Sequence, residues 1–119
     1  MTIKGALGKR GEEIAKNYLI GSGYTILKTN YRLGHLEMDI IAAQKNKLIF
    51  VEVKTRARST NSETDNLLNP QQVIRLKRLI SAYCYRVKHN PDLIRLDLIV
   101  ILVNRANGRA ELIHYHDVS

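Results

Sequence analysis

The segment Leu96–Val103 constrains the fold most, because it is apolar on both faces of the β-strand that its composition predicts. Every residue in it except Asp97 is Leu, Ile or Val. A strand of this kind needs cover on both sides, and helices are the usual cover. The run is far shorter than the roughly 20 apolar residues that cross a bilayer. We therefore expect a buried strand between helices, and no membrane partner.

The rest of the chain supplies two helices and four further strands. Helical spacing of apolar residues predicts helices over 8–20 and 70–88, and Asn69 and Pro70 are typical of a helix start. Strands are expected over the ranges 24–31, 36–43, 47–55 and 111–115. The polar segment 58–69 is expected to be a mobile surface loop. This order predicts an α/β (α+β) fold in which helices flank a mixed β-sheet, within a single domain, 1–119.

Charge and cysteine content point to a partner and a compartment. Nineteen Lys and Arg residues stand against eleven Asp and Glu residues, which gives a formal net charge of +8. Such an excess favours a polyanionic partner such as nucleic acid. The single Cys84 excludes an internal disulfide and fits a reducing cytoplasm.

Two acidic residues interrupt apolar strand segments on either side of the Lys45–Asn46 turn. A turn centred there pairs residues whose numbers add up to 91, so that Asp39 faces Glu52 and Glu37 faces Lys54. Directly opposed, half-buried carboxylates repel each other and lose solvation. A divalent cation such as Mg²⁺ or Mn²⁺ would compensate, since Mg²⁺ takes one or two carboxylates and keeps several waters.

Lys54 lies on the same face as Glu52, about 7 Å further along the strand. Its ammonium could orient an attacking water or stabilise charge on a phosphate. It could equally form a structural ion-pair network with the neighbouring acids. Glu12, on the first helix, could reach the same sheet, although a glutamate in a first helical turn is also favoured simply by the helix dipole. Geometry alone leaves both interpretations open.

The sequence gives weaker evidence of function for the other polar residues. His114 and His116 are expected at a frayed end without a cysteine partner, which argues against zinc. Cys84 lies on the apolar face of its helix and is expected in the core. A basic stripe on the second helix could neutralise phosphates or could be an ordinary solvated face.

Four ordered segments resemble the YraN family of small bacterial proteins, also called UPF0102. They are Gly8–Glu13, Asn30–Arg32, Glu37–Ala42 and Phe50–Arg56. That family is similar to the PD-(D/E)XK nucleases, particularly Holliday-junction resolvases. The resemblance implies a restriction-endonuclease-like fold with a metal site formed by Glu12, Asp39 and Glu52, and with Lys54 as the signature lysine.

The resulting hypothesis is a Mg²⁺- or Mn²⁺-dependent endonuclease acting on DNA, including branched or structured DNA. Asp39, Glu52, Lys54 and Glu12 are the expected catalytic residues. The residues expected to contact nucleic acid are Arg56, Arg58, Gln72, Arg75, Lys77 and Arg78. The alternative is a non-catalytic nucleic-acid-binding domain that retains the nuclease fold. Resolvase-like proteins often act as dimers, so a homodimer is compatible with the resemblance, but no dimer interface can be identified from the sequence.

Overall fold

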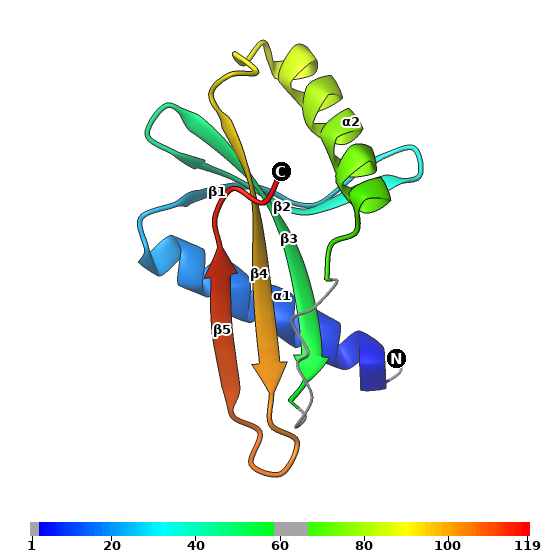
Figure 1. The fold of residues 1–119 in the computed structure, drawn as a ribbon. Helices are drawn as coiled ribbons and strands as arrows, with labels where there is room; N and C mark the ends of the chain where they lie inside the picture. Colours follow the sequence, from blue (N-terminus) through cyan, green and yellow to red (C-terminus); the bar gives the residue numbers. More distant parts are fainter. Residues whose placement is uncertain (1–2, 59–66) are drawn as a thin grey trace.

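The computed structural model describes residues 3–58 and 67–119. The elements, in chain order, are α1 (Ile3–Gly21), β1 (Thr25–Leu33), β2 (Leu36–Gln44), β3 (Lys47–Ala57), α2 (Pro70–Val87), β4 (Ile94–Val103) and β5 (Ala110–Tyr115) (Figure 1). This is the expected order of one helix, three strands, one helix and two strands. The predicted mobile loop falls largely on residues 59–66, which lie outside the described residues.

The five strands form one mixed sheet in the order β1-β2-β3-β4-β5. β3 and β4 run parallel, and the other neighbouring pairs are antiparallel. The single parallel pair requires a crossover, which α2 provides. The α+β class predicted from the sequence is therefore confirmed.

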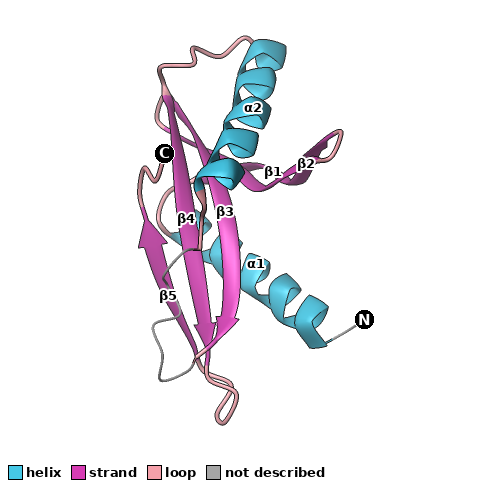
Figure 2. Cartoon of the chain, turned by 45° about the vertical axis from the view of Figure 1, so that its right-hand side comes forward, coloured by secondary structure: helices cyan, strands magenta, loops and turns pink. Residues whose placement is uncertain are grey.

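The two helices cover opposite faces of the sheet. Ile49 and Val51 of β3 pack in the cluster that contains Ala15 and Leu19 of α1. Phe50, between them in sequence, packs with the α2 side chains. Because neighbouring strand residues point to opposite faces, these two clusters are the two sides of the core. Figure 2 shows α2 beside the end of the sheet where β4 begins, and α1 crossing nearer its middle.

β4 is the buried strand that its composition predicts. Leu96, Ile99, Val100 and Ile101 have no exposed surface, and neither has Asp97. The helix cover on both faces explains why almost every position along this strand is apolar.

The start of α1 differs from the prediction. The helix begins at Ile3 and not at Gly8, and Leu7, Gly11, Ala15 and Leu19 form one face of it at four-residue spacing. Glu12 consequently lies in the body of the helix, beyond its first turn. Favourable placement against the helix dipole therefore does not explain this residue.

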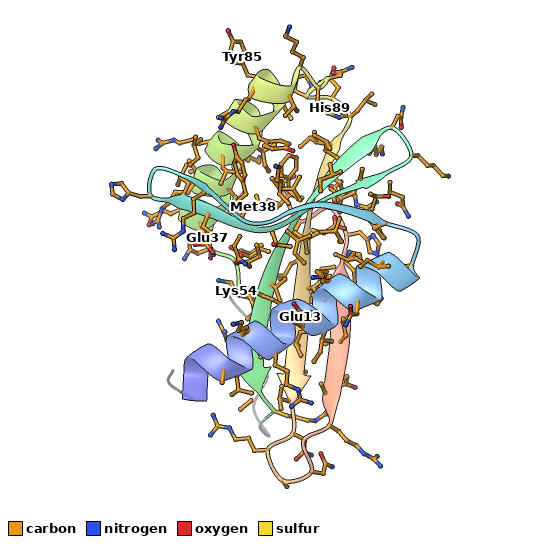
Figure 3. The ribbon with its side chains drawn as sticks, turned by 180° about the vertical axis from the view of Figure 1, so that it is seen from behind. Glu13, Glu37, Met38, Lys54, Tyr85 and His89 are labelled. Carbon is orange, nitrogen blue, oxygen red and sulfur yellow. The ribbon has the colours of Figure 1, made fainter. Side chains whose placement is uncertain are left out.

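The ladder between β2 and β3 follows the predicted register and then stops. It runs from Gln44 opposite Lys47 to Ile40 opposite Val51. Beyond Ile40 the β1–β2 hairpin continues as an independent two-stranded arm, residues 29–39, which crosses the sheet (Figure 3). The expected pairing of Glu37 with Lys54 is wrong, because Glu37 lies opposite Arg32 of β1 and their charged groups are 3.3 Å apart.

Candidate active site

The candidate site lies where β2 leaves β3. Asp39 is the first β2 residue beyond the ladder, and its Oδ2 accepts a hydrogen bond of 2.7 Å from the main-chain N–H of Val53. A side-chain carboxylate thus takes the place of the main-chain carbonyl that a continued ladder would supply. The same position brings Asp39 into hydrogen-bonding contact with the carboxyl group of Glu52.

This carboxyl pair is electrostatically strained. Burial raises the pKa of Asp39 to about 8, and the hydrogen bond and charge of Glu52 act in the same direction. The Val53 N–H and the charge of Lys54 oppose the rise without cancelling it. In the absence of a cation, the pair therefore holds a proton near neutral pH. Two oxygen ligands whose charges repel each other are a chemically suitable donor set for a divalent cation.

Gln72 connects the second carboxylate to α2. Its Nε2 donates to Glu52 Oε2 at 3.2 Å, and Glu52 is only 8% exposed. The residue is placed there by the start of the helix, where Asn69 Oδ1 accepts from the Gln72 main-chain N–H at 2.8 Å. The helix cap predicted from the sequence therefore also orients a side chain toward the site.

Glu12 approaches the pair from α1. Burial and the charge of Asp39 raise its pKa, while a hydrogen bond with Asn30 lowers it. Glu12, Asn30 and Asp39 line one small cavity of about 50 Å³. Close packing of the helix on β3 permits this approach, because a Cβ atom on Gly11 would lie 1.9 Å from Thr55 Oγ1.

Lys54 is half-buried beside the carboxyl pair. Its position on β3 places it between the β1–β2 arm and α1 in Figure 3. It also lines, with Glu12, a larger groove that continues along β3. The four residues predicted as catalytic are thus brought to one region of the molecule. They do not form a finished three-carboxylate cage, because Glu12, Asp39 and Glu52 are not a set of ligand atoms within 4.8 Å of one another in the described part of the chain.

The residues expected to contact nucleic acid are distributed unevenly. Arg75, Lys77 and Arg78 are exposed on α2, and Arg56 is exposed on β3. Arg58 is ion-paired with Glu111, so its charge is partly neutralised within the chain.

A second polar cluster, which the sequence analysis missed, surrounds the buried Asp97. Arg95 donates to both of its carboxylate oxygens through Nε and Nη2, each at 2.8 Å. His114 Nε2 lies 2.7 Å from Oδ2, and the Asp117 main-chain N–H donates to Oδ1 at 2.9 Å. An ionised carboxylate only accepts, so His114 donates to Asp97 from Nε2. Its Nδ1 is hydrogen-bonded to the Tyr18 hydroxyl at 2.8 Å.

By distance alone, Asp97, His114 and His116 could hold a metal ion, because one ligand atom from each lies within 4.8 Å of the others. In the structure, however, four donors already occupy the Asp97 oxygens, and the Arg95 guanidinium would repel a cation. The expected fraying at this end is wrong: the His114 side chain is 4% exposed and is stacked on His116 with ring centroids 3.8 Å apart. The available signals were an aspartate inside an apolar strand and two histidines two residues apart, of which His114 lies on β5 and His116 directly follows its end.

Fold and site together define an α+β protein with a carboxyl pair and a lysine at the point where a β-hairpin leaves its sheet. One carboxyl group of the pair, Glu52, is buried, and the other, Asp39, is half-buried. Residues 11–101 match the family described as "Uncharacterised protein family UPF0102". The chain belongs to that family, as its motifs predicted.

Two relatives illustrate the match. The UPF0102 protein of Leifsonia xyli subsp. xyli is 36% identical over 114 residues, which cover 96% of each chain. The UPF0102 protein of Christiangramia forsetii is 37% identical over 105 residues, which cover 88% of this chain and 87% of that one. Among solved structures, Pyrococcus furiosus SfsA in complex with Ca²⁺ aligns with a TM-score of 0.45 at 16% identity, over 95% of this chain and 63% of the SfsA chain.

Neither helix in the described part of the chain combines the length and apolar character that a membrane-spanning helix needs.

Proposed function

We propose that this protein is a Mg²⁺- or Mn²⁺-dependent endonuclease that hydrolyses phosphodiester bonds in DNA, with branched or otherwise structured DNA as the substrate class. One observation carries the proposal: the half-buried Asp39 contacts the buried Glu52, and Lys54 lies two residues beyond Glu52 on the same strand. The expected family likeness to PD-(D/E)XK nucleases assigns the same residues to the same roles.

The donor set fits a hard divalent cation. Asp39 and Glu52 offer carboxylate oxygens. Glu12 stands close enough to Asp39 for the charge of Asp39 to raise the pKa of Glu12. Mg²⁺ commonly uses one or two protein carboxylates and completes its shell with water. When bound, such a cation supplies a water of lowered pKa and a positive charge for the phosphate.

The protein groups around the pair have distinct tasks in this proposal. The Val53 N–H and the Gln72 amide hold the two carboxylates in place. The Lys54 ammonium orients the attacking water or stabilises the charge that develops on the phosphate oxygens. The excess of basic residues, a formal net charge of +8, favours encounter with DNA.

The test is cleavage of fluorescent DNA by purified protein in Mn²⁺, with single-stranded, duplex and branched substrates. Asp39→Asn and Lys54→Met should abolish cleavage. Glu12→Gln should reduce it, whereas the control Asp92→Asn should not, because Asp92 is exposed and lines neither cavity of the site. Absence of cleavage of every substrate, or cleavage that survives Asp39→Asn, would refute catalysis.

A non-catalytic DNA-binding domain is the second candidate, and the incomplete convergence of Glu12, Asp39 and Glu52 favours it. It predicts salt-sensitive DNA binding without hydrolysis. Calorimetric titration with Mn²⁺ separates the two, since only the enzyme requires a binding site that disappears in Glu52→Gln.

A further inference from the structure

A groove extends from the candidate site along β3. It has a volume of about 890 Å³ and is lined by α1 on one side, by the β3 residues 53–57 on the other, and by Arg105 from the turn between β4 and β5. β2 no longer pairs with β3 in this region, so the groove occupies the space beside β3 that the departing arm leaves. Figure 1 shows that the end of β3 and the β4–β5 turn lie at the same end of the sheet, near the first half of α1.

Most charged residues along the groove are basic. The groove is lined by one acid, Glu12, and by the three cations Lys54, Arg56 and Arg105. The carboxyl pair lies next to it, because Glu52 directly precedes the lining residues 53–57 on β3. None of these three cations forms an ion pair with a carboxylate of the residues 3–58 and 67–119. Arg32, Arg58 and Arg95, by contrast, are each paired with an acid. The groove therefore concentrates positive charge that the described part of the chain does not neutralise.

Hydrogen bonds hold the β4–β5 turn, which carries Arg105, beside the groove. Arg10 of α1 donates from Nη2 to the Gly108 carbonyl at 2.7 Å, which ties the turn to the helix. Within the turn, Gly108 N donates to Asn104 O at 2.7 Å, and Asn104 Oδ1 accepts from Ala106 N at 2.9 Å. Arg105 thus starts from a backbone that is hydrogen-bonded on both sides of it.

We propose that this groove binds the sugar-phosphate backbone of one DNA strand, with Arg105 and Arg56 contacting phosphates that neighbour the one at the carboxyl pair. This proposal rests on the proposed function, which places one phosphate of the DNA strand at the carboxyl pair. It adds Arg105 as a phosphate-binding residue. A chain of phosphates matches the groove because it can place one anion beside each basic side chain. A divalent metal ion held by Asp39 and Glu52 would accommodate the neighbouring phosphate at the carboxyl pair.

The experiment measures DNA binding without cleavage. Fluorescein-labelled single-stranded and duplex DNA are titrated with protein in EDTA at several salt concentrations, and the slope of log K against log salt is compared between variants. Removing one phosphate contact reduces the slope by about 0.9 for duplex and about 0.7 for single strands. Arg105→Gln should show this loss. Arg109→Gln is the matched control, because Arg109 is exposed on the same turn but does not line the groove.

The outcomes separate this proposal from hydrolysis. If Arg105→Gln lowers the slope and Arg109→Gln does not, the groove assignment holds, even for a protein that cleaves nothing in Mn²⁺. If the two variants bind DNA with the same slope as the wild type, the assignment is refuted, even for a protein that cleaves DNA in Mn²⁺. A circular dichroism spectrum of each variant confirms that the fold is retained, which is expected because both arginines are exposed.

Discussion

The contact between Gly11 and Thr55 can be tested by adding one methyl group. An alanine Cβ at position 11 would lie 1.9 Å from Thr55 Oγ1, 3.1 Å from Thr55 Cβ and 3.3 Å from Thr55 Cγ2. Rotation about the Thr55 Cα–Cβ bond moves Oγ1 and Cγ2 but leaves the 3.1 Å contact with Cβ, so helix α1 must shift away from β3. Gly8, one helical turn earlier, has no neighbouring atom within 4 Å of the equivalent Cβ position, which makes Gly8→Ala a matched control.

Two opposing effects set the magnitude. Alanine is about 1 kcal/mol more favourable than glycine inside a helix. Overpacking costs about 1–3 kcal/mol. Gly8→Ala should therefore raise the free energy of unfolding by up to about 1 kcal/mol. Gly11→Ala should leave it unchanged or lower it by up to about 2 kcal/mol, which is the difference between these two effects.

Urea denaturation followed by circular dichroism measures both variants. Combining Gly11→Ala with Thr55→Ala should recover part of the loss, because it removes Oγ1 and Cγ2 but leaves the 3.1 Å contact with Cβ. Cleavage should also fall in Gly11→Ala alone, since the displaced helix carries Glu12. The packing argument fails if Gly11→Ala stabilises the protein as much as Gly8→Ala does.

Further results are expected at three residues, which are Asp39, Asp97 and Cys84. In EDTA, Asp39→Asn should stabilise the protein near neutral pH. Burial and Glu52 raise the Asp39 pKa to about 8, so the wild type loses stability as pH rises from about 4 toward 8. Equal denaturation midpoints of the two proteins at pH 7 would contradict this. For Asp97, burial alone would raise the pKa, but hydrogen bonds from His114 and Arg95 hold the pKa at about 2. The contribution of Asp97 to the free energy of unfolding therefore persists above about pH 4 and disappears as pH falls toward 2. Asp97→Ala should cost about 3–5 kcal/mol, because it leaves Arg95 unpaired, whereas Asp92→Ala at an exposed position should change stability by less than about 0.5 kcal/mol. Cys84 is 2% exposed, and burial raises the pKa of its thiol, so alkylation by iodoacetamide should be slow until the protein unfolds; rapid labelling of native protein would be inconsistent with this placement.

The hairpin around Lys45–Asn46 shows how far sequence reasoning extends. The turn position was enough to predict the register from Gln44–Lys47 to Ile40–Val51, which the structure confirms. The end of that ladder could not be predicted, because the alternation of apolar residues continues past it. Asp39 still meets Glu52, through side chains and outside the ladder.

The start of helix α1 and the Asp97 cluster are two features that could not be predicted from the sequence pattern. Glycines at positions 5 and 8 weaken the helical signal, so the predicted start fell after the true one, Ile3. The Asp97 cluster depends on the pairing of β4 with β5, which places His114 opposite Ile99 and next to the buried carboxylate. A local pattern carries no information about such a register between strands joined by a turn of several residues.

The hydrogen bond from Val53 to Asp39 makes one main-chain amide a reporter of the candidate site. The Val53 N–H faces a carboxylate whose charge changes with protonation, with bound cation and with substitution. Its amide chemical shift and its hydrogen-exchange rate should therefore follow events at Asp39 directly. A single resonance in a ¹⁵N spectrum can thus register occupation of the site by Mg²⁺, without any substrate and without any assumption about the reaction.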